Sequence, residues 1–265
     1  MDLVYIVKED DNNEELRYSL RSIAKYLPES RVWIVGHKPN WVQNVEYIHT
    51  EQKAGKWQNS VNNIIAACQS EDITDDFVLM NDDFFAVRPI KDLEASCNVA
   101  IGTIDQAIQK YINHKSAWFD AFKYAKELLE QMGIEGPYYN YESHSPIILN
   151  KKLFLEFINM PEIQDFMKTK KILHKRSVYK NIYKIKPKML PEDIKLNKDD
   201  DIKTKTKICD WFSVYDRQIH CLSYPQLNLY LKANYPTQCK YEAFVPVVRA
   251  FGEPPKKKKD FIHNF

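Results

Sequence analysis

Short apolar runs alternate with stretches of helical periodicity in the first part of the chain. Four runs have the length and composition of buried strands, at residues 3–7, 31–35, 45–50 and 77–81. Between them, apolar residues recur at helical spacing, as in Leu16, Leu20 and Ile23, and Asn12 or Asn13 can cap that helix. This alternation of strand and helix is typical of a parallel sheet covered on both faces. The sequence therefore predicts an α/β fold with a Rossmann-like sheet and helices on both faces.

The pattern changes in the second part of the chain. One long helix is predicted over residues 105–132, and a strand followed by a helix over 143–157. Residues 168–207 are rich in lysine and have little periodicity, as expected of an ordered lid or a mobile loop. A strand-like run at 207–216 and a last helix at 218–232 complete the prediction. Because no repeat or low-complexity linker interrupts the chain, we expect residues 1–265 to form a single domain with a lysine-rich insertion.

Composition is that of a globular protein with a sizeable core. Hydrophobic residues make up 44% of the chain and charged residues 28%. The formal net charge is +2, so the overall charge requires no polyanionic partner. Two regions are locally basic, residues 168–207 and the lysine run 256–259. They are interpreted either as solvated surface or as contacts to phosphates of a nucleotide, a nucleic acid or a lipid-linked acceptor.

The cysteines and the first residues of the chain indicate the cellular compartment of the protein. The five cysteines are scattered and contain no CxxC pair, which fits a reducing environment. The first residues resemble a strand and lack the basic lead-in of a signal peptide. No stretch approaches the roughly 20 apolar residues of a membrane span. The sequence therefore predicts a cytoplasmic protein without a membrane span.

The strand at 77–81 runs directly into two carboxylates, in the sequence "FVLMNDDFF". In open α/β sheets, ligands bind outside the carboxyl ends of the strands, where Asn81, Asp82 and Asp83 would lie. Paired carboxylates at such a position suit Mg²⁺ or Mn²⁺ carrying a diphosphate, and sugar-nucleotide transferases use a comparable acidic strand end. The other interpretation is a turn with solvated aspartates. Since neighbouring apolar residues imply burial, the sequence favours a metal site at Asp82 and Asp83.

Several separate segments together resemble the Stealth family of sugar-phosphate transferases. The segment "EELRYSLRSIAKYLPESRVWIVGHKPNWV" at 14–42 is similar to a family region, and "WQNSVNNI" at 57–64 and "LMNDDFF" at 79–85 follow in the family's order. The resemblance implies a nucleotide-diphospho-sugar transferase fold of the GT-A type. It also implies a nucleotide-sugar-binding half at 1–104 and an acceptor and catalytic half at 105–265.

Three later segments resemble the remaining family regions. "SHSPIILNK" would make His144 the active-site histidine, "LHKRSVY" points to Arg176, and "DWFSVYD" ends in Asp216. The resemblance implies that Asp83, His144 and Arg176 are catalytic. It further implies substrate-binding residues outside these three, namely Lys8, Arg17, Arg21, Asn59, Asn81 and Asp216. The usual "VTWVDG" opening of the family is replaced by "VYIVKED".

Each of these residues also has a structural interpretation. His144 is either a general base that takes a proton from an acceptor hydroxyl or a core or capping histidine. Arg176 is either a diphosphate ligand or a solvated cation. The structural interpretation of Arg17 and Arg21 is a surface face of a helix, and that of Asn59 and Asp216 is a helix cap. The aromatic set Trp118, Phe119 and Phe122 is interpreted as core, with sugar stacking as the functional alternative.

The sequence thus favours a metal-assisted transferase. A nucleotide-diphospho-sugar would donate a sugar or a sugar phosphate to the hydroxyl group of a saccharide or another acceptor, with Mg²⁺ or Mn²⁺ at Asp82 and Asp83. Two alternatives stay open. One is a glycosyltransferase that acts on a hydroxylated base in DNA, and the other is a non-catalytic module that binds sugar nucleotides.

Overall fold

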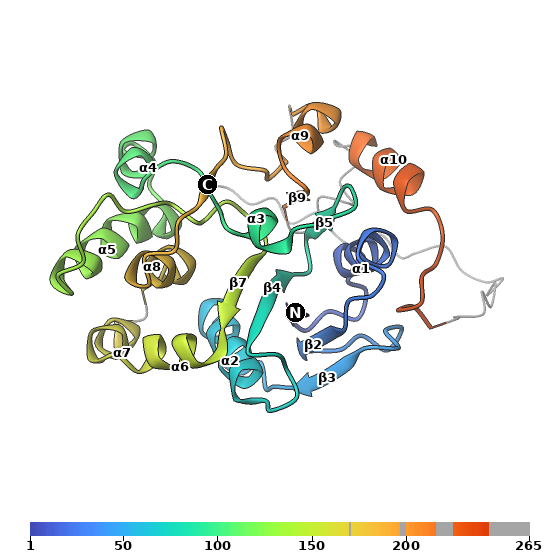
Figure 1. Cartoon of the computed structure of the whole chain (residues 1–265), viewed down its shortest axis with the longest axis horizontal. Helices are drawn as coiled ribbons and strands as arrows, with labels where there is room; N and C mark the ends of the chain where they lie inside the picture. The colour runs from blue at the N-terminus through green and yellow to red at the C-terminus, as the bar shows by residue number, and fades with distance from the viewer. Residues whose placement is uncertain (170, 197–199, 216–224, 244–265) are drawn as a thin grey trace, which may run out of the picture.

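A five-stranded sheet with the order β3-β2-β1-β4-β7 forms the centre of the protein (Figure 1). The computed structural model describes residues 1–169, 171–196, 200–215 and 225–243. The strands of this sheet are β1 (Asp2–Val7), β2 (Val32–Gly36), β3 (Glu46–His49), β4 (Asp76–Asn81) and β7 (Ile147–Asn150). The first four are parallel and β7 runs antiparallel to β4. The predicted α/β sheet is confirmed, with an antiparallel strand at one edge.

Helices cover both faces of this sheet. Alternate residues of β1 and β4, such as Val4 and Leu79, pack against α2 (Lys56–Gln69), α5 (Ala117–Gln131), α6 (Lys151–Asn159) and α8 (Lys175–Ile182). The residues between them, such as Tyr5 and Met80, pack against α1 (Glu14–Tyr26) and α3 (Leu93–Cys97) on the opposite face. Strands that are buried on both faces lack a polar side, which explains the uninterrupted apolar runs in the sequence.

The long helix predicted over 105–132 is in fact two helices, α4 (Ile104–Lys110) and α5. Thr103 begins α4 with a capping box that involves Gln106. Ser116 begins α5, where its hydroxyl accepts a hydrogen bond from the backbone amide of Trp118 at 3.3 Å. A polar N-cap of this kind stops one helix and starts another, because its side chain satisfies an amide that has no partner inside the helix.

The described part of the lysine-rich segment contains helices and a strand. It contains the end of α7 (Pro161–Lys168), all of α8, β8 (Lys188–Met189) and α9 (Ile202–Ile208). Two of its lysines are buried: Lys180 binds the side-chain oxygen of Asn98 and the carbonyl of Ile148, both at 2.7 Å, and Lys205 binds Glu192 at 2.7 Å. These two ammonium groups hold the fold together and are not available to phosphates.

Two small sheets complete the architecture. β5 (Phe84–Ala86) pairs antiparallel with β9 (Trp211–Ser213), and β6 (Val99–Ala100) pairs parallel with β8. The last described helix is α10 (Pro225–Asn234), so the helix predicted at 218–232 begins outside the described residues. Among the described residues, no helix combines the length and the apolar character needed to cross a membrane. The four cysteines described, Cys68, Cys97, Cys209 and Cys239, form no disulfide.

Candidate active site

The acidic pair lies at the carboxyl edge of the sheet, in the turn between β4 and β5. Asp82 Oδ2 accepts a hydrogen bond from the side-chain amide of Asn13 at 2.7 Å, and Asn13 is also the N-cap of α1. Asp83 Oδ2 accepts a hydrogen bond from the hydroxyl of Ser213 at 2.8 Å, at the end of β9. Within the described part of the chain, each carboxylate therefore uses one oxygen for a protein contact that fixes its orientation and has no hydrogen-bond partner at the other oxygen.

The surroundings of Asp82 raise its pKa. Burial and, next, the charge of Asp83 raise the pKa of Asp82 to about 7, while the Asn13 hydrogen bond and the charge of Lys8 act to lower it. Lys8, which follows β1, is thus close enough for its charge to act on the pKa of Asp82. A cation between the carboxylates would remove the repulsion that raises this pKa.

This raised pKa gives a prediction about stability. We expect Asp82→Asn to raise the melting temperature of the metal-free protein at about pH 8 and to change it little at about pH 4. The pKa of Asp82 is about 7 in the folded chain against a usual 3.8, so ionisation costs the fold stability as pH rises through this range and the full cost is present above it. Thermal unfolding of both proteins across this pH range measures the difference, and a variant that is less stable at the higher pH would contradict the prediction.

His144 reaches the same edge because β7 is antiparallel. β7 pairs Ile147 with Leu79 near the end of β4, so the loop just before β7 lies beside the acidic turn. His144 sits in that loop with a left-handed backbone, φ +50°, which histidine adopts more readily than most residues. Its Nδ1 donates a hydrogen bond to Asp193 Oδ2 at 2.7 Å.

Asp193 determines which nitrogen of His144 can act as a base. Burial acts to raise the pKa of Asp193, but the charge and hydrogen bond of His144 and the backbone amide of Lys195 together hold this pKa below its ordinary value. An ionised carboxylate only accepts hydrogen bonds, so the proton of the neutral imidazole stays on Nδ1. The lone pair on Nε2 of His144 is then the one that can take a proton from a substrate hydroxyl.

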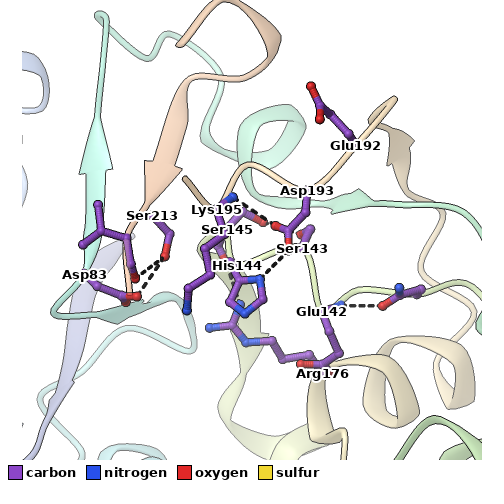
Figure 2. Close-up of polar contacts among 12 residues, drawn as sticks. Asp83, Glu142, Ser143, His144, Ser145, Arg176, Glu192, Asp193, Lys195 and Ser213 are labelled. Atoms are coloured by element: carbon purple, nitrogen blue, oxygen red, sulfur yellow. Dashed lines mark hydrogen bonds and ion pairs between the residues drawn. The ribbon is translucent and has the colours of Figure 1, made fainter. Parts of the chain in front are cut away.

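Arg176 supplies a buried cation beside these groups (Figure 2). It is the second residue of α8, donates a hydrogen bond to the carbonyl of Ser145 at 2.5 Å, and its guanidinium lies 5.2 Å from the ring centre of Phe84. Burial lowers the pKa of Arg176, whereas the charges of Glu142 and Asp83 act to raise it. The guanidinium group stays charged in proteins and binds phosphate oxygens in a fork, so Arg176 is a suitable diphosphate ligand.

A hydrogen-bonded pair of segments joins the supports of Asp83 and His144. Lys195 forms a parallel bridge with Ser213, and the amide of Leu196 donates to the carbonyl of Ser213 at 2.8 Å. Asp193 lies two residues before this bridge, and the amide of Lys195 donates to Asp193 Oδ1 at 3.1 Å. The partner of Asp83 and the partner of His144 therefore belong to one backbone unit (Figure 2).

Other predicted residues lie apart from these contacts. Arg17 and Arg21 both bind the buried carboxylate of Glu242, at 2.9 and 2.7 Å, so this helical face packs against the C-terminal part of the described chain. Asn59 forms two hydrogen bonds with the backbone of Ala54, which fixes the loop before α2. Asn81 ends β4 and is half-buried. Asp216 and the lysine run 256–259 lie outside the described residues.

Sequence reasoning missed the groups that hold the candidate site together. Asn13 was expected only as a helix cap, and Ser213 and Asp193 were not singled out. Their contacts to Asp82, Asp83 and His144 join residues 69, 130 and 49 positions apart in the sequence. The one signal available for Asp193 was its place in "LPEDIK", an acidic pair inside a lysine-rich segment.

Asp82 and Asp83 fit a divalent cation that is completed by its substrate. Within the part of the chain that the structure describes, no group of three or more His, Cys, Asp and Glu side chains could hold a metal ion by itself. Mg²⁺ is commonly held by one or two carboxylates, with substrate phosphates and water filling the other positions. The acidic pair and the nearby guanidinium of Arg176 match that chemistry.

The fold is shared with known glycosyltransferases. No protein-family model matches the chain, and no curated protein matches it in sequence. Two crystal structures of the galactosyltransferase LgtC, one with donor and acceptor sugar analogs and one of an active-site mutant, give TM-scores of 0.52 and 0.50. They are 8% and 9% identical to this chain, cover 93% and 91% of it, and are themselves covered over 98% of their length.

The bifunctional glycosyltransferase WbbM is a further structural neighbour. It is 14% identical, with a TM-score of 0.48 over 80% of this chain and 45% of its own. From the LgtC structures, the predicted GT-A-like fold is confirmed. The resemblance to the Stealth family rests on the quoted sequence motifs alone.

Proposed function

We propose that the protein is a nucleotide-sugar-dependent transferase with its active site at Asp83, His144 and Arg176. The observation that carries this proposal is that Asp83, an oriented imidazole and a buried guanidinium group lie together at the carboxyl edge of a GT-A-like sheet (Figure 2). Asp82 is next to Asp83 in the same turn. Ligands of open α/β sheets bind at this edge. LgtC, which shares the fold, was crystallised with donor and acceptor sugar analogs, which supports a donor and a saccharide acceptor for this chain as well.

Each side chain has a distinct task in the proposed reaction. Asp82 and Asp83 would hold Mg²⁺ or Mn²⁺, and the cation would neutralise the charge of the donor diphosphate. Arg176 binds the same diphosphate and stabilises the charge that grows on it as the bond to the leaving group breaks. Nε2 of His144 accepts the proton of the acceptor hydroxyl while Asp193 stabilises the imidazolium that forms.

The proposed site components serve two reactions. Attack on the sugar carbon transfers a sugar and releases a nucleoside diphosphate. Attack on the β-phosphorus breaks the bond between the two phosphates, transfers a sugar phosphate and releases a nucleoside monophosphate, and the resemblance to the Stealth family favours this second reaction. Both need a hydroxyl deprotonated close to the donor diphosphate. LgtC, a galactosyltransferase, shares the GT-A-like fold, so sugar transfer is the simpler proposal and sugar-phosphate transfer the alternative.

A donor screen tests the proposal. Purified full-length protein is incubated with a panel of nucleotide-diphospho-sugars, Mg²⁺ or Mn²⁺ and a panel of saccharides, and the products are weighed by mass spectrometry. The mass added to the acceptor distinguishes a hexose from a hexose phosphate. If no nucleotide sugar is hydrolysed or transferred with either metal, the enzyme proposal fails, and donor binding without turnover would instead identify a non-catalytic module.

DNA is the less favoured acceptor. The basic segment that would contact phosphates uses Lys180 and Lys205 inside the fold. Retention of DNA that falls steeply with salt concentration would restore this alternative.

A further inference from the structure

We propose that Trp57 and Trp118 form the acceptor subsite, on which the apolar face of a pyranose ring stacks beside His144. This inference rests on the proposed function and names the class of its acceptor as a saccharide. The sequence alone favoured a core role for Trp118. In the structure Trp118 is only half-buried, and Trp57 is 40% exposed.

The two indoles stack on each other, so a sugar ring would stack on the outer side of this pair. Trp57 is the second residue of α2 and Trp118 the second residue of α5, and their ring centres lie 5.4 Å apart with an angle of 28° between the planes. The N-terminus of α2 lies at the carboxyl edge of the sheet, because the helix follows parallel strand β3 and leads into parallel strand β4. The pair is therefore on the same edge as the acidic turn.

The surface adjoins the proposed base. The ring centre of Trp118 lies 6.0 Å from that of His144, with the planes tilted by 30°. A sugar ring that stacks on this pair has its hydroxyl groups at the edge of the ring, next to the imidazole. The distance between the Trp118 and His144 rings is thus short enough for one acceptor residue to contact both.

Buried contacts hold Trp118 in place before any ligand arrives. The rings of Trp118 and His174 pack nearly at right angles, with centres 4.4 Å apart and planes at 79°, and Nε2 of His174 donates to the carbonyl of Trp118 at 3.0 Å. His174 is 1% exposed. A platform fixed in this way loses little conformational entropy on binding, which favours affinity.

A saccharide fits this surface better than other ligand classes. Pyranose rings have an apolar face of C–H groups and a polar edge, and exposed indole offers apolar area with little rotational freedom. The apolar area is that of a single stacked pair of indoles, and the ammonium of Lys56 lies 5.6 Å from the Trp57 ring centre. Stable protein interfaces need an apolar centre far larger than this. Since a nucleobase could also stack on indole, the experiment includes nucleotides.

Collisional quenching of tryptophan fluorescence tests the subsite in the full chain. Of the five tryptophans, Trp33, Trp41 and Trp211 are at most 7% exposed, so acrylamide reaches mainly Trp57 and Trp118. The probes are the methyl pyranosides of glucose, galactose, mannose and N-acetylglucosamine and, separately, the nucleoside diphosphates UDP, GDP and ADP. We expect at least one pyranoside to protect the wild type from quenching, and Trp57→Ala to bind it about tenfold more weakly because apolar contact area is lost.

Two variants make the result specific. Trp57→Phe keeps part of the ring and should bind with intermediate affinity. Tyr47→Ala removes a ring that is equally exposed, at 40%, from edge strand β3, and should bind like the wild type. Nucleotide-sugar hydrolysis in Tyr47→Ala should equal that of the wild type, since the Tyr47 hydroxyl bonds to the carbonyl of Gly36 and to His49 and not, in the described part of the chain, to Asp83 or Arg176.

The outcomes separate this inference from the proposed function. Protection that persists in Trp57→Ala, protection by nucleotides but by no pyranoside, or no protection by any pyranoside would each overturn the subsite. If the wild type still hydrolyses nucleotide sugars in those cases, the proposed function stands. Absence of hydrolysis in the wild type would overturn the proposed function whatever the quenching shows.

Discussion

Asp83→Asn is expected to reduce metal-dependent transfer by about a thousandfold or more, the effect of losing several kcal/mol of transition-state stabilisation by the cation. The substitution leaves the shape of the side chain almost unchanged. Its amide oxygen can still accept the hydrogen bond that Ser213 donates to Asp83 at 2.8 Å, so the turn between β4 and β5 should keep its structure. What is lost is one of the two negative charges that attract the cation. Steady-state rates with Mg²⁺ and Mn²⁺, together with thermal unfolding, measure the two effects separately.

Asp75→Asn is the matched control for this variant. Its carboxylate lies at the other end of β4 and is 92% exposed, so the variant should turn over at the wild-type rate. Unchanged turnover of Asp83→Asn with both metals would show that Asp83 is not a ligand. An equal loss in both aspartate variants would indicate damage to β4 instead of loss of the cation.

The second large effect is expected for His144→Asn, with a rate lowered by about a hundredfold to ten-thousandfold and an unchanged dissociation constant for the donor. Asparagine is preferred to alanine for this test because residue 144 has φ +50°, a backbone that asparagine tolerates and that costs alanine about 1 kcal/mol. Loss of a general base slows proton transfer without removing a diphosphate ligand. Transfer rates and calorimetric titration with donor distinguish the two. Weakened donor binding would make His144 a binding residue.

Asp193→Asn tests the positioning role that the structure adds. We expect kcat to fall by about a hundredfold, and the acidic limb of the kcat/KM profile to move to lower pH, because removal of a negative charge disfavours protonated imidazole. The neighbouring Glu192→Gln is its control, since Glu192 binds Lys205 at 2.7 Å and is half exposed. A merely structural role of Asp193 would lower the amount of folded protein and leave the pH profile unmoved.

The central sheet could be predicted from the sequence because each of its buried strands produces a local run of apolar residues. β1, β2 and β4 are buried on both faces and appear as runs of four or five apolar residues. The direction of β7 could not be predicted, since a short apolar run has the same pattern in a parallel and an antiparallel pair. The division of 105–132 into two helices was missed because the cap at Ser116 interrupts a periodicity that continues on either side.

Some residues of the candidate site could likewise be predicted from the sequence, whereas others could not. Asp82 and Asp83 could be located from the strand that precedes them, and His144 and Arg176 from family resemblance, although their roles stay predictions. The supports of these residues depend on contacts between distant segments, such as His144 with Asp193 and Asp83 with Ser213. No local pattern encodes such pairs, and residue type alone does not distinguish Ser213 or Asp193 from a solvated side chain.

The bridge between Lys195 and Ser213 has a consequence for how the chain acquires activity during synthesis. The five strands of the central sheet are complete once Asn150 has been made, whereas Asp193 and Ser213 come later. Domains begin to fold from the N-terminus as they leave the ribosome, at about 5–20 residues per second. A nascent chain can therefore build its scaffold first and gain an oriented base and an anchored Asp83 together, in a single late step.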